Sequence, residues 1–191
     1  MKSSIRAIAM ASTALGASLV LSDIAAAQVD TITVTAQRRE QTLQETPIAV
    51  SAVAEEQLTL GQIRDVRDLQ QLVPSLRVAQ FSRSGVTEFA IRGLGTSADN
   101  VGLEPSVAVF VDNVYRSRQG AAINDFLSLE RVEVLRGPQS TLFGKNSPAG
   151  VVHFITQAPE YEFGAVGEVT VSNYNGRIFR GTVTGPVMDG N

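Results

Sequence analysis

The chain has 191 residues, of which 43% are apolar and 18% charged, and its formal net charge is -3. This composition is typical of a globular protein rather than a disordered one, and the negative charge gives no reason to expect a nucleic-acid partner. The absence of cysteine excludes a disulfide framework, a thiolate metal site and a cysteine nucleophile, and the lone histidine, His153, excludes a histidine-rich zinc site within the chain.

Residues 1–27 have the features of an export signal. Lys2 and Arg6 precede an apolar run over residues 7–21, and the segment ends in Ala25, Ala26 and Ala27. A basic head, a short apolar stretch and small residues at the end are the three parts of a secretory signal peptide, and the alternative is a buried N-terminal helix. We therefore expect export, with the mature chain beginning at Gln28. No other segment has the length and apolarity of a transmembrane helix, so a membrane crossing would have to use strands.

Directly after this signal, residues 30–36 read DTITVTA and alternate polar with β-branched apolar side chains. That period of two predicts a short strand. Residues 37–44, QRREQTLQ, follow as a polar, charged tether with no face that could join a core. Two interpretations remain open: a strand that adds to the sheet edge of another protein, or an ordinary edge strand of this chain's own sheet.

From residue 46 the pattern predicts a small α+β domain. Strands are expected over residues 47–53, 76–80, 88–92, 106–111, 114–118, 132–135 and 151–156. One short helix is expected over residues 55–60, and a second follows the Gly137-Pro138 break and ends at Leu142. A further helix is expected over residues 63–73, because its apolar residues lie on one helical face and Pro74 would stop it; they are Ile63, Val66, Leu69 and Val73. Asp112 and Asn113 tolerate the left-handed conformation of a tight hairpin between two of the strands.

Beyond Pro159, residues 163–172 and 177–184 alternate apolar with polar side chains around an Asn-Gly turn at Asn175 and Gly176. Two such strands fit the first strands of an outer-membrane barrel, and they fit a half-exposed hairpin equally well.

Motifs for chemistry are missing. Gly93, Gly95 and Ala98 approximate a dinucleotide fingerprint but precede loop residues instead of a helix, and residues 137–145 have the wrong spacing for a phosphate loop. Glu130 and Glu133 bracket Arg131 and are interpreted as solvated or paired acids, and His153 as a structural residue of its strand. We expect no catalytic residue, no metal site, no cofactor and no enzymatic activity.

Several separated motifs together resemble the TonB-dependent outer-membrane receptors. Residues 129–156, LERVEVLRGPQSTLFGKNSPAGVVHFIT, resemble the C-terminal part of the plug domain of that family. Residues 89–93 look like its Ile-Arg-Gly motif, residues 109–115 (VFVDNVY) look like its Val-Asp-Gly-Val hairpin, and residues 30–36 look like its TonB box. Asn113 replaces the usual hairpin glycine, Phe143 stands where Tyr is common and His153 where Asn is common.

The resemblance implies a fold and a division of the chain. The expected fold is an α+β plug domain, a small mixed sheet with short helices, followed by the first antiparallel strands of a transmembrane β-barrel. The expected segments are a signal peptide over 1–27, the TonB box and tether over 28–45, the plug over 46–158 and the first two barrel strands over 159–191. Because barrels of this family have about 22 strands, we expect the chain to be an N-terminal fragment of a longer receptor.

The resemblance also implies a function: active transport at the cell outer membrane of a Gram-negative bacterium, with the plug gating uptake of a scarce ligand. An iron-siderophore complex is the family's commonest cargo, and cobalamin, haem and glycans are also known. The implied partners are the inner-membrane TonB protein, the receptor's own barrel, a small-molecule or metal-chelate ligand and outer-membrane lipid. The alternative is a periplasmic or surface binding module that uses the plug fold without transport.

Three groups of site residues follow from the resemblance. The TonB box, called here the box strand, comprises Asp30, Thr31, Ile32, Thr33, Val34, Thr35 and Ala36. Arg92 and Arg136 are expected to make ionic contacts between plug and barrel, with solvated arginines as the alternative. The apical ligand loops are expected to contribute Ser82, Arg83, Ser84, Thr96, Ser97, Asp99 and Asn100.

Overall fold

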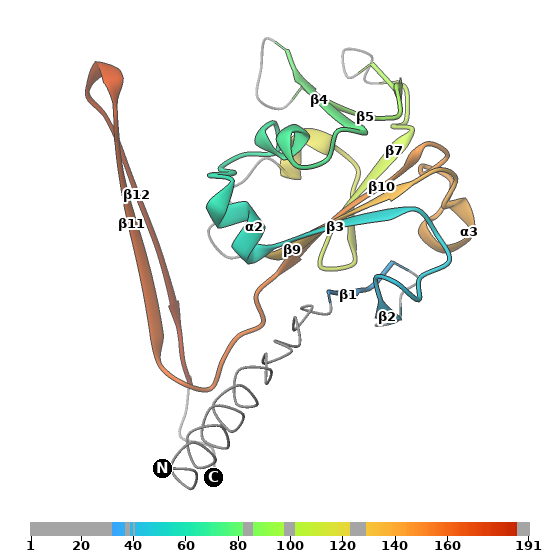
Figure 1. Cartoon of the computed structure of the whole chain (residues 1–191). Coiled ribbons are helices and arrows are strands. Elements are labelled where there is room, and N and C mark those ends of the chain that lie inside the picture. The colour runs from blue at the N-terminus through green and yellow to red at the C-terminus, as the bar shows by residue number, and fades with distance from the viewer. Residues whose placement is uncertain are drawn as a thin grey trace, which may run out of the picture. The chain divides into compact units, whose positions relative to one another are not determined.

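A five-stranded mixed sheet forms the centre of the domain in this computed structural model, which describes residues 32–36, 39, 41–81, 86–97, 102–122 and 129–186. The strand order is β3-β9-β10-β7-β8; β7 and β10 are parallel and the other neighbouring pairs antiparallel (Figure 1). The bounds are Val50–Ala54 for β3, Val107–Val111 for β7, Val114–Arg116 for β8, Leu129–Arg136 for β9 and Gly150–Thr156 for β10. The signal-peptide prediction concerns residues outside the described part.

The middle residues of the central strands β9 and β10 are buried on both faces, and β10 accordingly has a nearly continuous apolar sequence. Val132 and Val134 lie in one hydrophobic cluster, whereas Leu135 belongs to a second cluster on the other face. The fully buried polar residues of these strands are Glu133 and His153, which are register partners and are 0% and 1% exposed. Both faces of the sheet are therefore covered by other elements of the chain.

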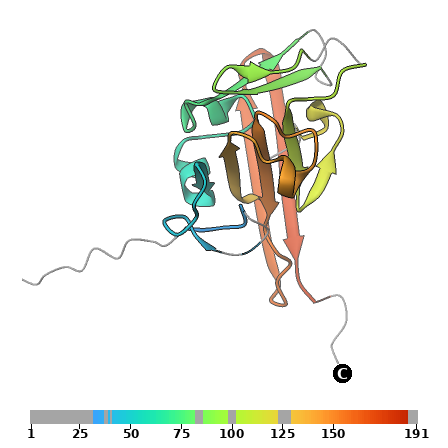
Figure 2. The same ribbon diagram turned by 90° about the vertical axis from the view of Figure 1, so that its right-hand side faces the viewer.

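The first face is covered by a small sheet and two short helices. The small sheet has the order β4-β5-β6, with bounds Leu76–Gln80, Thr87–Ile91 and Leu94–Gly95, and it lies at one end of the five-stranded sheet in both ribbon views (Figures 1 and 2). The helices are α2 (Glu55–Leu60) and the 3-10 helix η1 (Asp68–Gln71). Leu58, Leu69, Phe89 and Ile91 from these elements join the first hydrophobic cluster.

The helix expected over residues 63–73 is wrong in extent, although its buried face is correct. Only η1 is helical, yet Ile63, Val66, Leu69 and Val73 are all buried. Asp68 Oδ2 accepts the backbone N–H of Arg64 and of Asp65, at 3.0 and 3.2 Å, and Asp65 Oδ1 accepts the backbone N–H of Arg67 at 2.7 Å. These side chains bond backbone donors locally and hold the segment in turns rather than in a regular helix.

The second face is covered by a small hairpin and a short helix. The hairpin pairs β1 (Thr33–Val34) with β2 (Gln41–Thr42), and the helix α3 spans Ser140–Phe143. Phe110 makes tilted or edge-on ring contacts with Tyr115 and Phe143, at centroid distances of 5.6 and 5.3 Å. These aromatic side chains belong to the second hydrophobic cluster, together with Val34 and Ala36.

The tight turn between β7 and β8 has the geometry that the sequence predicts. Asp112 and Asn113 have φ of 47° and 66°, so both residues adopt the left-handed conformation that a tight hairpin requires. Asp112 also accepts hydrogen bonds from the Thr156 N–H and hydroxyl at 2.8 and 2.9 Å. The turn is therefore tied to the end of β10.

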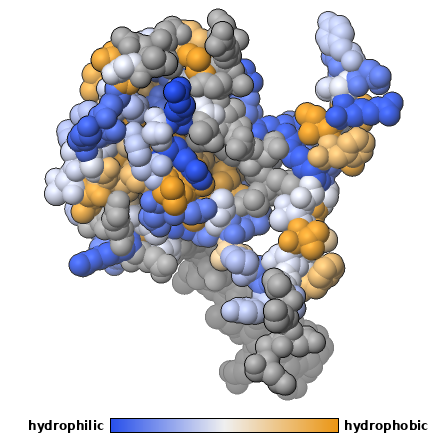
Figure 3. Space-filling view, turned by 180° about the vertical axis from the view of Figure 1, so that it is seen from behind, coloured by the Kyte–Doolittle hydropathy of each residue, from blue (hydrophilic) through white to orange (hydrophobic). Residues whose placement is uncertain are grey.

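Two longer strands, β11 (Gly164–Ser172) and β12 (Gly176–Thr184), pair only with each other among the described residues. Their register places Val169 opposite Phe179 and Glu168 opposite Arg180. The apolar side chains of one face are exposed: Val169 65%, Val171 74%, Phe179 73% and Val183 72%, and apolar side chains are visible on the hairpin in Figure 3. Within the described residues, no helix has the length and apolarity to cross a membrane.

Candidate functional site

The described part of the box strand, residues 32–36, is docked on the plug. Thr33 pairs with Thr42 and Val34 with Gln41, and the Leu43 N–H donates to the Ile32 carbonyl at 2.9 Å. Asp30 and Thr31 lie outside the described residues. The strand is therefore neither free nor part of the five-stranded sheet; it forms its own hairpin with residues that the sequence analysis assigned to the tether.

Two side chains of the box strand are buried in the second hydrophobic cluster. Val34 is 0% exposed and Ala36 is 1% exposed, and the cluster includes Phe110, Leu135 and Phe143. Leu43, inside the expected tether, also packs against this cluster. The expectation of a solvated tether with no face for a core is therefore wrong for the described residues. The tether is docked because Leu43 packs against the cluster and β2 pairs with β1.

Glu133 holds the box strand from the centre of the sheet. Its Oε1 accepts the Thr35 backbone N–H at 2.8 Å and the Thr35 hydroxyl at 3.2 Å. The Arg131 Nε donates to the same oxygen at 2.9 Å, and the Arg131 guanidinium also pairs with Glu130. The sequence interpretation of these acids as solvated or paired is correct for pairing, but it missed the contact with Thr35.

Arg92 follows the end of β5 and Arg136 is the last residue of β9; these two strand ends meet beside Gly150. A Cβ on Gly150 would lie 2.3 Å from the Leu135 carbonyl oxygen and 2.8 Å from Ile91 Cδ1, so only glycine fits there. Arg92 is exposed and has a φ of 53°, and its backbone N–H donates to the Ser75 carbonyl at 2.8 Å. The Arg136 guanidinium donates to the Val50 carbonyl at 3.4 Å. Arg136 therefore has a partner within the plug.

The expected ligand loops emerge from one end of the small sheet. The loop of residues 82–85 joins β4 to β5, and β6 runs antiparallel to β5, so the chain after Gly95 returns toward the same end. Ser82, Arg83, Ser84, Asp99 and Asn100 lie outside the described residues. Thr96 anchors its loop, because its hydroxyl lies 2.5 Å from the Ser106 hydroxyl and accepts the Ser106 N–H at 3.0 Å. Ser97 is exposed.

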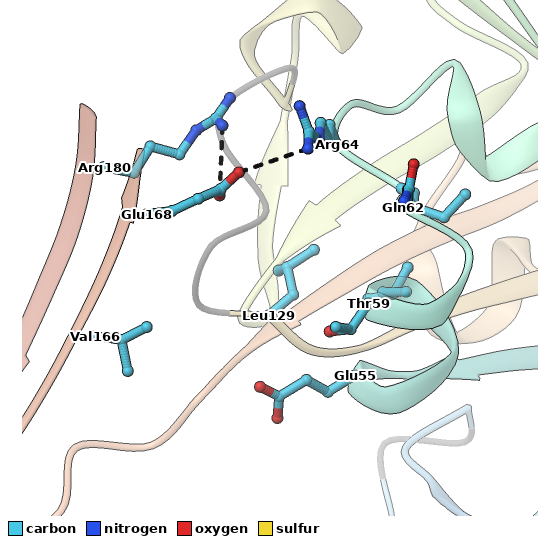
Figure 4. A pocket seen from close by; sticks show the side chains of 10 residues that line it. Glu55, Thr59, Gln62, Arg64, Leu129, Val166, Glu168 and Arg180 are labelled. Atoms are coloured by element: carbon cyan, nitrogen blue, oxygen red, sulfur yellow. Dashed lines mark ion pairs between the residues drawn. The ribbon is translucent and has the colours of Figure 1, made fainter. Parts of the chain in front are cut away.

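A pocket of about 370 Å³ lies between the plug and the hairpin (Figure 4). Its lining includes Leu58 and Ile63 from the plug and Val166 from β11. Glu168 points to two arginines, with Oε1 3.9 Å from Arg64 Nη2 and Oε2 3.5 Å from Arg180 Nη1. The ionic contact between plug and hairpin thus involves Arg64, which the sequence analysis did not single out; its exposed position in a turn gives no sequence signal.

The remaining chemistry is structural. His153 Nε2 accepts the Asn113 backbone N–H at 3.1 Å, which ties β10 to the β7–β8 turn. Among the described residues, no three His, Cys, Asp or Glu side chains are grouped to hold a metal ion. Three features therefore stand out: the docked strand of residues 32–36, the loops at one end of the small sheet β4-β5-β6, and the β11–β12 hairpin with its exposed apolar face.

Comparisons with known proteins show the family to which the chain belongs. The sequence profile of the TonB-dependent Receptor Plug Domain matches residues 42–151, more than half of the chain. The chain therefore belongs to the TonB-dependent receptor family, and its fold is the plug fold followed by strands like those of the family's barrels. This membership assigns it to the outer membrane.

Three relatives show how far the likeness extends. The chain is 30% identical over 146 residues to the iron-regulated outer membrane virulence protein of Vibrio cholerae, covering 70% of this chain and 21% of that protein. It is 31% identical over 147 residues to the ferrioxamine B receptor of Salmonella typhimurium, covering 76% and 20%. The crystal structure of the ferric yersiniabactin uptake receptor FyuA from Yersinia pestis superposes with a TM-score of 0.64 at 25% identity, covering 75% and 22%. None of these names denotes an enzyme, and the chain spans about a fifth of the length of its relatives.

Proposed function

We propose that the chain forms the gate of a TonB-dependent transporter, and that residues 30–36 are the box to which TonB binds. The observation that carries this proposal is the docked strand 32–36, which lies on the face of the plug sheet opposite the small sheet. The strand pairs with β2 over two residue pairs only, so few main-chain hydrogen bonds hold it in its site. Once released, it can add to a sheet of TonB through main-chain hydrogen bonds, each contributing about 1 kcal/mol net.

The proposed cargo is an iron-siderophore complex. It is supported by the ferrioxamine B receptor and the ferric yersiniabactin uptake receptor among the similar proteins. The loops around residues 82–85 and 96–101, which leave one end of the small sheet, are the proposed ligand side of the plug. In this proposal residues 1–27 are the signal peptide, 28–45 the box and tether, 46–158 the plug and 159–191 the first barrel strands.

Contacts between plug and barrel are proposed for Arg92 and Arg136, with Arg64 as a third. Arg92 is exposed in the turn between β5 and β6, whereas Arg136 already bonds the Val50 carbonyl. Arg64 has an acidic wall partner, Glu168, within 3.9 Å. The exposed Arg64–Glu168 pair contributes little stability and can therefore exchange as the plug moves.

The test is an uptake assay on cells that express the whole receptor with Ile32→Pro. Proline removes a main-chain donor from the strand, so we expect energised uptake to be abolished while binding of ligand to the receptor is unchanged. Ile32→Val is the matched control and should transport normally. Uptake at the wild-type rate in the proline variant would refute the box assignment.

The cargo is tested in the same cells with radiolabelled ferric hydroxamate, catecholate and phenolate siderophores beside cobalamin. Energised uptake of one of the ferric complexes, absent in Ile32→Pro cells, is the expected outcome. Energised uptake of cobalamin alone would support the proposed gate but overturn the proposed cargo.

A further inference from the structure

The two edges of the box strand are not equivalent. In an antiparallel pair, residues that exchange hydrogen bonds alternate with residues whose N–H and C=O groups point away from the partner. The Ile32 carbonyl accepts the Leu43 N–H, so residues 32 and 34 face β2. The main-chain groups of Thr33 and Thr35 therefore point to the other edge, where a further strand would have to bind.

Glu133 occupies that outer edge. The Thr35 N–H, which a further strand would need, donates to Glu133 Oε1 at 2.8 Å. The Thr35 hydroxyl contacts both carboxylate oxygens, at 3.2 and 3.3 Å. A side chain thus takes the place of a neighbouring strand, which is one way in which proteins block an open sheet edge.

The carboxylate is well placed to act in this way. Glu133 is 0% exposed, and a buried carboxylate is tolerated only with an ionic partner and hydrogen-bond donors. Arg131 supplies the ionic partner at 2.9 Å, and Thr35 supplies two further donors. When the box strand leaves, Glu133 loses the Thr35 N–H and hydroxyl as donors. A buried carboxylate that loses its donors costs free energy, and this cost favours the docked state.

We propose that Glu133 is the latch of the box strand: it holds the Thr35 N–H and blocks the outer edge, so that a strand of TonB can pair there only after this contact breaks. The proposal rests on the proposed function for the identity of the partner. The contact itself does not depend on that identity. Glu133 is a positioning residue, because it acts on the partner through the box strand.

The test compares three variants of the full chain. Glu133→Leu removes the acceptor at similar size, and Arg131 keeps its pair with Glu130. Glu133→Gln keeps an acceptor oxygen but loses the charge. Glu130→Gln is the matched control, because it removes the other acidic partner of Arg131 without touching the box strand.

The first readout is amide hydrogen exchange at Thr35. A hydrogen bond to a charged group is lost in Glu133→Leu, so exchange should be faster by about tenfold or more, with the amides of β10 still protected. Glu133→Gln should lie between this variant and the wild type, and Glu130→Gln should match the wild type. Unchanged exchange in Glu133→Leu, or an equal increase in Glu130→Gln, would overturn the latch. If the β10 amides of Glu133→Leu lose their protection, that variant is not folded, and the comparison of Glu133→Gln with Glu130→Gln replaces it. Faster exchange at Thr35 in Glu133→Gln than in Glu130→Gln then supports the latch, and equal exchange overturns it.

The second readout is binding of the purified periplasmic domain of TonB. Its affinity for Glu133→Leu should rise by about the factor seen in exchange, because more of the strand is released. If exchange rises but the TonB domain binds no variant, the latch stands and the box assignment fails. If the TonB domain binds wild type and Glu133→Leu equally, and Thr33→Pro, which removes a main-chain donor from the outer edge, abolishes binding, the box assignment stands and the latch is overturned.

Discussion

Gln119 joins the two sheets of the plug through one buried side chain. Its Oε1 accepts the Phe89 N–H of β5 at 3.2 Å, and its Nε2 donates to the Val107 carbonyl of β7 at 2.8 Å. Both backbone groups lie beyond the ends of the short neighbouring strands β6 and β8, so no strand satisfies them there. A buried donor or acceptor without a partner costs free energy of folding. The Gln119 side-chain amide supplies a partner to both the Phe89 N–H and the Val107 carbonyl.

We expect Gln119→Leu to lower the free energy of unfolding by about 2–4 kcal/mol, because two buried backbone groups lose their partner. Chemical denaturation followed by circular dichroism measures this change. Gln157→Leu, at an exposed position after β10, is the control and should be nearly neutral. Equal stability of the two variants would show that water replaces the amide.

At the residue scale, local geometry was predictable and distant partners were not. Asp112 and Asn113 could be placed in a tight turn because their conformational tolerance depends on the residues themselves. Glu133 was recognised only beside Arg131, because its second partner, Thr35, lies 98 positions away. Gln119 likewise connects residues 30 and 12 positions away and carries no local signal.

At the element scale, the segment of residues 61–75 shows how side chains override a periodic pattern. Its apolar spacing identified the buried residues correctly, but the carboxylates of Asp65 and Asp68 bond the backbone in turns. Burial alone would raise the pKa of Asp65, but the Arg67 guanidinium and the N–H groups of Arg67 and Asp68 outweigh it and hold that pKa below its ordinary value of 3.8.

This shift predicts a pH-dependent effect of Asp65→Asn. A lowered folded-state pKa means that the ionised carboxylate contributes stability above about pH 3.8, and that the contribution is lost as the pH falls through the folded-state pKa. The wild type should therefore be more stable than Asp65→Asn at neutral pH, with the difference shrinking in acid. Denaturation curves over this range measure it, and Arg67→Gln should show the same trend. A difference that grows in acid would contradict the assignment.

Strands could be predicted more reliably than their pairing. The bounds of β4, β11 and β12 follow from alternation, and those of α2 from its flanking residues. The parallel pairing of β7 with β10 could not be inferred, because it joins residues 107–111 to 150–154 and no turn sets its register. The docking of β1 on β2 was missed because the segment between them reads as polar.

At the scale of the whole molecule, the hairpin β11–β12 separates two environments. One face carries Val169, Val171, Phe179 and Val183, all exposed, and the other carries Glu168 and Arg180, which pair with each other. Apolar-out and polar-in alternation is the pattern of an outer-membrane strand. Either a barrel strand or a half-exposed hairpin fitted the sequence; family membership and the exposed apolar face together favour the barrel strand.

A lysine on each face distinguishes the two environments. In the whole receptor, Val169→Lys should reduce the amount in the outer-membrane fraction, because a lysine facing the bilayer midplane costs about 2–4 kcal/mol. Thr170→Lys, the adjacent position on the polar face, should remain near the wild-type level. Membrane fractionation and immunoblotting measure both variants, and equal losses would argue against a lipid-facing Val169.

The position of β3 at the edge of the five-stranded sheet has a mechanical consequence. Among the described residues, β3 pairs only with β9, over five residue pairs from Val50 to Ala54, and the chain from the box strand enters it at Val50. A pulling force applied to residues 32–36 and directed away from the sheet therefore breaks the five β3–β9 residue pairs one after another, beginning at Val50. The parallel pair of β7 and β10, inside the sheet, would be loaded only after the pairs β3–β9 and β9–β10. The plug would thus yield gradually from one border while its centre keeps its shape.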